Sequence, residues 1–355
     1  MSSHVSSNEL RLVGPEHPQW DEYVETHPKG TIFHTRAMAE AFAATEGFQT
    51  CAIAALDSQG SIVAMLVCCH VVTLPKLSRV ASRSIQYAEP LCNANSLGVA
   101  SLTQLLRWSD SQMRSKSLLS EIRFVHAQRD EVHACRQAGY TCSAYLNFLI
   151  DTSNSVPQLW DAVSPKRRQK IRSSRRKGVL VRDDQTPDGV SRLHGMMRLS
   201  YRRAQVPILP ENLFQNVLDM LPSGSVRLRT AFWNDRPVAS ILSLLYKDRV
   251  FSWCGGTERI RGISPFACIV WEDIAFAQEN GFTVYDFGGA GYPGKPYGPR
   301  AFKASFGGAR VDYGRYSLTY SRWRLAMANC AYELSKTLGF WSRGSRSEMQ
   351  HDLLK

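Results

Sequence analysis

The chain has 355 residues, of which 44% are hydrophobic and 21% are charged, and its formal net charge is +12. This composition excludes an intrinsically disordered protein and supplies enough apolar residues for two domains of ordinary size. The positive charge predicts anionic partners, with nucleic acid, phosphate-bearing metabolites and an acidic membrane surface as the alternatives.

Nine scattered cysteines show neither the spacing of a zinc site nor the even count of a disulfide framework, so we expect no metal. The first residues carry no apolar signal core, and no apolar run reaches the roughly 18 residues needed to cross a bilayer. These features predict a cytoplasmic protein that is at most attached to the inner face of the membrane.

The first half of the chain begins with an expected disordered tail at residues 1–10. Alternating apolar residues then predict a hairpin over 50–72, and apolar spacings of three and four predict a helix over 99–115. A further helix stops at Gly139 and leads into a strand over 143–150.

The second half repeats this order. Its patterns predict a helix over 189–204, three strands over 226–256, and a helix over 264–280 that stops at Gly281 and leads into another strand. In both halves an aromatic residue and a threonine follow the glycine that ends the helix.

This repetition predicts two copies of one α/β unit, with a Ser/Asn/Pro-rich boundary after residue 150. We expect the domains to cover 11–150 and 151–319, the second carrying the active site. A helix over 320–341 and a disordered tail over 342–355 follow.

The run "SPKRRQKIRSSRRKG" (164–178) holds eight cations and no acidic residue. As a helix, it places Arg168, Arg172 and Arg175 on one face, with Ile171 nearly alone in anchoring it. Such a helix repels itself and favours an anion, which could be tRNA phosphate, a nucleotide diphosphate or lipid headgroups. The alternative is a solvated face.

A phosphate-binding loop is predicted between the strand "VFSWCGG" and the helix that opens at Ser264. Gly262 permits backbone N–H groups to point at a ligand near a helix N-terminus, and Arg259 and Arg261 would add charge. The alternative is an ordinary strand-to-helix connection with solvated arginines.

The segment "YDFGGAGYPGKPYGPRAFKASFGG" (285–308) predicts a strand, a tight turn at Gly288 and Gly289, and a long loop. Lys303 follows the loop, flanked by Phe302 and Phe306. A cation held among apolar side chains acts strongly on a developing negative charge. The alternative is a surface lysine.

The order of the basic helix, "VFSWCGG", "SPFACIVWEDIAFAQENG", "VYDFGG" and "FKASFGG" resembles the Fem-type (FemAB-like) aminoacyltransferases of the GNAT acyltransferase superfamily. The likeness runs from about Trp20 to Tyr320. It implies an α/β chain of two tandem GNAT-like domains, with a cleft in the second and a C-terminal helix that returns to the first.

The resemblance also implies an activity. Fem-type enzymes move an amino acid from aminoacyl-tRNA to an amine of a peptidoglycan precursor, whereas other GNAT enzymes take an acyl group from coenzyme A. The family's Phe-Lys pair matches Phe302 and Lys303, which makes Lys303 the stabiliser of the oxyanion. Its Tyr-Asp/Asn-Phe-Gly-Gly matches Tyr285 to Gly289, which makes Asp286 a positioning residue, while Tyr292 and Tyr297 are hydrogen-bond donors.

The sequence leaves two donors open, aminoacyl-tRNA and acyl-CoA, and we expect no tightly bound cofactor. The chain lacks the coiled-coil insertion that some Fem proteins use with tRNA. Its "RIRGIS" (259–264) nearly matches the coenzyme-A loop Arg/Gln-x-x-Gly-x-Gly/Ala of ordinary GNAT enzymes.

We therefore predict an N-acyltransferase acting on an amine of an anionic peptidoglycan or polysaccharide precursor, either nucleotide- or lipid-linked. One alternative is an acyl-CoA-dependent GNAT enzyme acting on a small amine. Another is a nucleic-acid-binding protein on an inactive transferase scaffold. A third places the 320–341 helix on a membrane surface.

Overall fold

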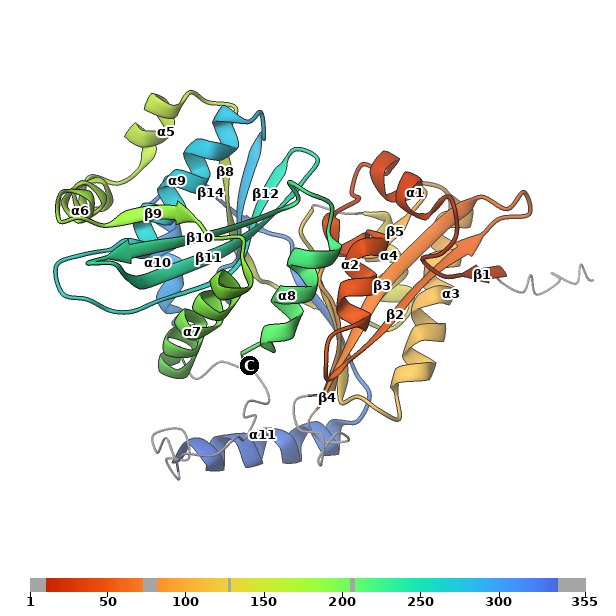
Figure 1. Ribbon diagram of the computed structural model, residues 1–355. Coiled ribbons are helices and arrows are strands. Elements are labelled where there is room, and N and C mark those ends of the chain that lie inside the picture. The colour runs from red at the N-terminus through yellow and green to blue at the C-terminus, as the bar shows by residue number, and fades with distance from the viewer. Residues whose placement is uncertain (1–10, 73–81, 127–128, 205–207, 338–355) are drawn as a thin grey trace, which may run out of the picture.

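The computed structural model describes residues 11–72, 82–126, 129–204 and 208–337, which form two α/β domains side by side (Figure 1). Each domain is built on one mixed sheet. The expected tails, and the end of the expected C-terminal helix at 338–341, lie outside the described residues.

The first sheet has the strand order β1-β2-β3-β4-β6-β15-β7, with β5 paired to β3. Its strands are β1 (Arg11–Val13), β2 (Phe48–Leu56), β3 (Ile62–Val72), β4 (Ser82–Gln86), β5 (Leu91–Cys92), β6 (Leu119–Arg123), β7 (Thr141–Ser143) and β15 (Arg315–Thr319). Its helical elements are α1 (Trp20–Thr26), the 3₁₀ turn η1 (Ile32–His34), α2 (Arg36–Ala43), α3 (Ser96–Met113) and α4 (Asp130–Gln137).

Strict alternation along β2 and β3 explains why helices cover both faces of this sheet. Met65 and Val67 join the core beneath α1 and α2, whereas Leu66 and Cys68 join the core beneath α3 and α4. The adjacent cysteines Cys68 and Cys69 are buried, as their apolar surroundings in the sequence predict.

The second sheet has the order β14-β8-β13-β12-β11-β10-β9. Its strands are β8 (Leu146–Asp151), β9 (Leu180–Asp183), β10 (Val226–Trp233), β11 (Arg236–Tyr246), β12 (Arg249–Thr257), β13 (Val284–Gly289) and β14 (Ala309–Asp312). Its helices are α5 (Val156–Ala162), α6 (Pro165–Arg176), α7 (Pro187–Ala204), α8 (Glu211–Met220), α9 (Pro265–Glu279) and α10 (Gly298–Ala304). The predicted hairpins and the four predicted helices 99–115, 164–178, 189–204 and 264–280 are confirmed within a few residues.

Sheet pairing corrects the expected domain boundaries. The strand expected to close the first domain at residue 150 is β8, which pairs with β13 and β14 of the second sheet. Conversely, β15, expected within the second domain, pairs with β6 and β7 of the first. An alternating pattern shows that a strand has a buried face but not which sheet it joins, because the pairing partners are distant in sequence.

The two domains share one hydrophobic core. Phe33 of η1 packs against Phe251 and Trp253 of β12, with ring centroids 5.4 and 6.1 Å apart. Lys247 adds a polar tie, since its Nζ donates to the carbonyl oxygens of Val24 (2.9 Å) and His27 (2.8 Å) at the end of α1. The junction is therefore packed and hydrogen-bonded.

The C-terminal helix α11 (Arg322–Thr337) lies below both domains in Figure 1. Its beginning is attached to the first domain, because Arg324 Nη2 donates to Ser117 O at 2.8 Å and Tyr320 donates to Asp110. Trp323 and Met327 remain 66% and 57% exposed. Within the described part of the chain, no helix has the length and apolar character to cross a membrane.

Candidate active site

Two parallel strands of the second sheet stop pairing before either strand ends, and we call the unpaired stretch between them the gap. The ladder between β12 and β13 runs only from the Arg249/Val284 pair to the Phe251/Asp286 pair, although β12 continues to Thr257 and β13 to Gly289. Beyond Phe251 and Asp286 no ladder pair joins the two strands. Open α/β sheets hold their ligands at such places.

Asp286 occupies the last paired position and is fully buried. Its carboxylate accepts from Asn147 Nδ2 (2.7 Å), the Gly288 amide (2.7 Å) and Arg249 Nη1 (2.6 Å). These three donors hold the carboxylate in one orientation. The arrangement suits the positioning role expected for Asp286, because it fixes the turn at Gly288 where β13 leaves the ladder.

Lys303 on α10 reaches the end of β13. Its Nζ donates to the carbonyl oxygens of Phe287 (2.6 Å) and Gly289 (2.7 Å). Burial lowers the pKa of Lys303 to about 8, against the attraction of Asp286, which raises it. An ammonium group has three N–H donors, so one remains for a ligand in the gap.

Phe302 packs beside Lys303 on the same helix. Its ring lies 5.6 Å from that of Phe266 and 5.2 Å from that of Phe306, measured between centroids. The Arg167 guanidinium carbon stands 4.4 Å from the Phe302 centroid, which ties α10 to the basic helix α6. Phe302 therefore anchors α10 and holds Lys303 in place.

The β12–α9 loop is partly occupied by α6 and the residue after it. Gly262 has a φ of +85°, and its carbonyl accepts from Lys177 Nζ at 3.0 Å. The Ser264 amide donates to Ser174 Oγ at 2.8 Å, so this N–H is already bonded. Arg259 and Arg261 are exposed at the rim. Gly262 therefore has a backbone conformation typical of such a loop. The Ser264 amide, which a phosphate-binding loop would use, is already bonded to Ser174 and is not available to a ligand.

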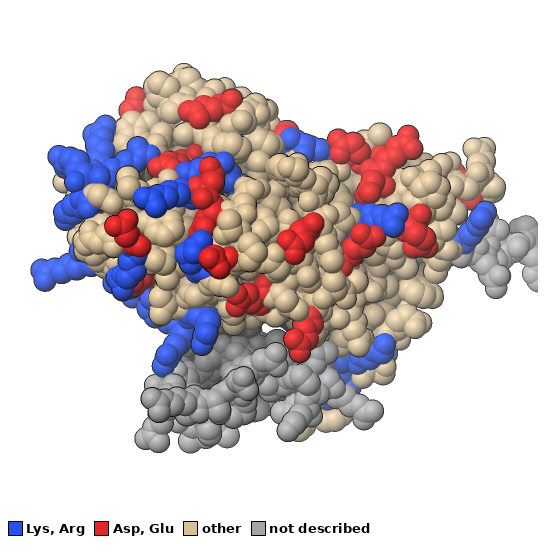
Figure 2. Space-filling model, viewed as in Figure 1, with Lys and Arg blue, Asp and Glu red and all other residues tan. Residues whose placement is uncertain are grey.

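The three arginines predicted on one face of α6 each contact a neighbouring side chain, although Arg172 and Arg175 remain exposed to solvent. Arg168 pairs with Asp161 (2.8 Å), Arg175 pairs with Glu272 (3.1 Å), and Arg172 lies over the Trp160 ring at 5.3 Å. The exposed cations of this helix without such contacts in the described structure are Lys166, Lys170 and Arg176. Figure 2 shows Lys and Arg gathered at this end of the second domain.

The tyrosines predicted for the site separate into two groups. Tyr285 is fully buried, and its ring packs edge-on against Phe287, so it belongs to the core and not to the substrate surface. Tyr292 and Tyr297 are 37% and 38% exposed on the loop before α10. Gly289 is needed here, because a Cβ at this position would stand 2.4 Å from the Tyr145 ring.

The structure adds a histidine–carboxylate pair that our sequence reasoning missed. Glu89 is fully buried and accepts from the Val125 amide (2.8 Å) and His126 Nδ1 (2.6 Å). Burial would raise the pKa of Glu89, but bonding to His126 and Val125 outweighs it and lowers the pKa. The partners are 37 residues apart, so no spacing motif marks them; the only signal is a glutamate inside the apolar stretch "YAEPL".

This pair is connected to the gap through Arg249. One Arg249 nitrogen, Nη1, donates both to Val125 O (3.3 Å), next to His126, and to Asp286 Oδ2 (2.6 Å). Burial raises the pKa of Tyr313, and the charges of Arg249, Asp286 and Glu89 also act on it. Arg249 of the second domain therefore links the segment that carries His126 to Asp286.

Residues 165–303 match the family described as an acetyltransferase (GNAT) domain, a range that runs from the first residue of α6 to Lys303. The match covers most of the second domain, including the gap, the β12–α9 loop and Lys303. It confirms the expected class of enzyme, an acyltransferase. A sequence search of curated proteins finds no match.

Solved structures extend the likeness across both domains. FemX matches with a TM-score of 0.64 at 14% identity, over 92% of this chain and 99% of its own. L-PGS from Bacillus licheniformis gives 0.55 at 13%, over 90% and 97%. A tandem GNAT protein from the clavulanic acid biosynthesis pathway gives 0.55 at 12%, over 88% and 99%. The expected tandem arrangement and the resemblance to a Fem-type fold are confirmed.

Proposed function

We propose that this protein transfers an aminoacyl or acyl group to an amine of a cell-wall peptidoglycan or polysaccharide precursor. The observation that carries this proposal is the Lys303 ammonium, which caps the end of β13 beyond its last pair with β12 and keeps one N–H free. The GNAT domain and the FemX-like fold support acyl transfer as the reaction.

The proposed reaction is an attack of the acceptor amine on the carbonyl carbon of an ester or thioester. The carbonyl electron pair moves onto oxygen, and Lys303 donates its remaining N–H to that oxyanion. The C–O or C–S bond then breaks, and the leaving group departs with the bonding pair as an amide forms. The donor is aminoacyl-tRNA or acyl-CoA.

We assign the proton released by the amine to His126. Its Nδ1 is bonded to the buried Glu89 carboxylate, which orients the ring and leaves Nε2 to accept a proton. The side chain is partly exposed. With this assignment the proton acceptor comes from the first domain and the oxyanion donor from the second, so the proposed reaction uses both domains.

We propose the remaining partners from exposed cations and from exposed apolar side chains. The exposed cations Lys166, Lys170 and Arg176 favour an anionic donor or acceptor, and tRNA is one such donor. The exposed Trp323 and Met327 of α11 favour contact with the inner face of the membrane, where a lipid-linked acceptor would lie.

The test compares Lys303→Met with the matched variant Lys295→Met, which removes an exposed lysine from the neighbouring loop. Transfer of an acyl group from acetyl-CoA, and of an amino acid from charged tRNA, to a panel of precursor amines is measured for each. We expect Lys303→Met to lower kcat by about a hundredfold and Lys295→Met to change it within a few-fold.

Equal activity of Lys303→Met and wild type would show that Lys303 is not the oxyanion donor. No transfer from either donor, together with RNA binding that weakens steeply with salt, would instead favour a nucleic-acid-binding protein on an inactive scaffold.

A further inference from the structure

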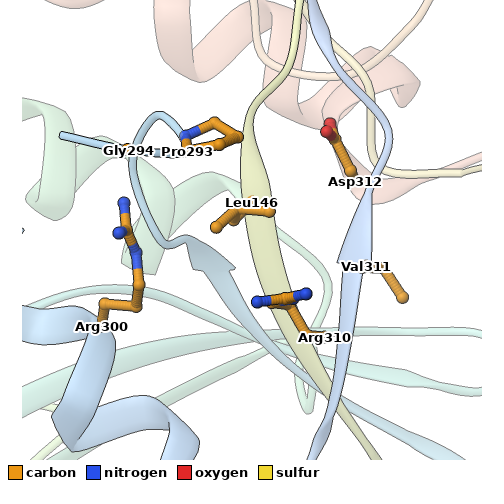
Figure 3. A pocket seen from close by; sticks show the side chains of 7 residues that line it. All are labelled: Leu146, Pro293, Gly294, Arg300, Arg310, Val311 and Asp312. Atoms are coloured by element: carbon orange, nitrogen blue, oxygen red, sulfur yellow. The ribbon is translucent and has the colours of Figure 1, made fainter.

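A groove of about 440 Å³ opens at the edge of the second sheet (Figure 3). Its walls come from β8, from the loop before α10 with α10 itself, and from β14. The lining residues on which our inference depends are Leu146, Pro293, Gly294, Arg300, Arg310 and Asp312.

Two guanidinium groups face this groove without a carboxylate between them. Arg300 is fixed by its own loop, because Nε donates to Ala290 O (2.9 Å) and Nη2 to Tyr292 O (2.6 Å), which leaves Nη1 for a ligand. Arg310 is exposed and contacts no other described residue through its side chain. Figure 3 shows its guanidinium reaching from β14 toward the side of the groove where Arg300 stands.

The one acidic side chain in the groove does not neutralise them. Asp312 Oδ1 accepts from the amides of Tyr145 (2.8 Å) and Gly314 (3.0 Å), so this carboxylate holds the turn after β14. Within the described residues no ion pair joins Asp312 to Arg300 or Arg310. Two like charges facing one cavity repel each other and favour an anion between them.

Helix α10 connects the groove to Lys303. Arg300 and Lys303 lie one turn apart on α10, and together they donate to the carbonyl oxygens of Phe287, Gly289, Ala290 and Tyr292. One short helix therefore fixes both the proposed oxyanion donor and a wall of the groove.

The strand order separates the groove from the β12–α9 loop. The order β14-β8-β13-β12 places β8 and β14 on the opposite side of β13 from β12, after which the β12–α9 loop follows. A ligand at that loop and a ligand in the groove would therefore lie on opposite sides of β13.

We infer that this groove binds an oxyanion carried by the acceptor, either a carboxylate or a phosphate. Planar guanidinium groups pair with both in two-point fashion, and the Leu146 side chain gives the groove an apolar floor. The inference rests on the proposed transferase function and adds to it that the amine acceptor is an anion recognised beside α10.

The test is calorimetric titration of the full chain with inorganic phosphate and with succinate, at constant ionic strength. The variants are Arg310→Glu, Arg310→Gln and the matched control Arg11→Glu, which reverses an exposed arginine on β1 of the other domain. We expect one saturable site in the wild type, at least tenfold weaker binding in both Arg310 variants, and binding within twofold of wild type in Arg11→Glu.

Tighter phosphate binding would assign a phosphate group and tighter succinate binding a carboxylate, and either supports the inference. Absence of a saturable site, or equal weakening by Arg11→Glu in variants with wild-type circular dichroism, would overturn it. Coenzyme A and charged tRNA are titrated in parallel. If Arg310→Glu lost donor binding as well, the groove would belong to the donor. Failure of the wild type to transfer an acyl group would overturn the proposed function while leaving the oxyanion result standing.

Discussion

At the scale of single residues, the site depends on polar side chains that both build the structure and face the substrate. Lys303 holds the end of β13 through two carbonyl groups, and Asp286 holds the turn that follows through three donors. Because these bonds fix each group before a substrate arrives, little reorganisation is needed when charge develops.

The pH dependence of transfer should report Lys303. Burial lowers the pKa of Lys303 to about 8, so the ammonium is present below this pH and is lost as the pH rises through it. We expect kcat to fall above about pH 8 in the wild type and to persist to pH 9 in Lys303→Arg, since a guanidinium stays charged. Rate profiles from pH 6.5 to 9.5 measure this. Identical profiles for the two proteins would contradict the role of the charge.

Asp110 offers a stability test in the first domain. Burial raises the pKa of Asp110 to about 6, although bonds from Tyr320 and Tyr140 lower it in part. The folded state therefore binds a proton that the unfolded chain releases near pH 4, and the resulting stabilisation is lost as the pH rises from about 4 to 6.

We accordingly expect Asp110→Asn to gain stability relative to wild type between pH 4.5 and 7, by about 1–3 kcal/mol. Urea unfolding at the two pH values measures the difference. If the difference in unfolding free energy between the two proteins did not change with pH, Asp110 would titrate normally.

At the scale of elements, the basic helix α6 is held to the domain by few contacts. Ile171 is fully buried against α9, Ser174 bonds the Ser264 amide, and Arg167 lies over Phe302. Through these contacts α6 supports both the β12–α9 loop and α10. The position of α6 therefore influences both the β12–α9 loop and the helix that carries Lys303.

Ile171→Ala should cost about 2–4 kcal/mol of unfolding free energy, because it leaves a cavity under a helix with little other apolar anchorage. The control Arg176→Ala removes an exposed side chain of the same helix and should stay within about 0.5 kcal/mol of wild type. Denaturant titrations compare them. Equal midpoints would show that the charged contacts of α6, not Ile171, hold it.

At the scale of the whole molecule, the two domains behave as parts of one core. Phe214 of α8 is fully buried and packs against Trp253, while α8 itself lies against α2 of the first domain. With Lys247 bonded to the end of α1, the junction contains both apolar and polar contacts. We therefore expect the domains to unfold together.

Calorimetry should show one transition with equal calorimetric and van't Hoff enthalpies. Phe214→Ala should lower the free energy of unfolding by about 3–5 kcal/mol and shift that single transition without dividing it. Two separate transitions in the wild type would show that the domains are independent.

Much of this architecture is readable from local patterns. Apolar spacing predicts α3, α7 and α9 because residues three or four positions apart lie on the same face of a helix. The Phe302–Lys303 pair and the glycines after Asp286 stand out as a motif, and the structure brings Lys303 and the Gly288–Gly289 turn together at one strand end.

Other features depend on partners that no local pattern names. Alternation could not assign β8 or β15 to a sheet, and the Asn147–Asp286 bond joins residues 139 positions apart. Arg168, which we expected to bind an anion, pairs with Asp161 of the preceding helix α5. Periodicity and turn chemistry are local and therefore visible in the chain. Other features form only when segments far apart in sequence pack together. These are the sheet to which each strand belongs, the burial of Tyr285 and the Glu89–His126 pair.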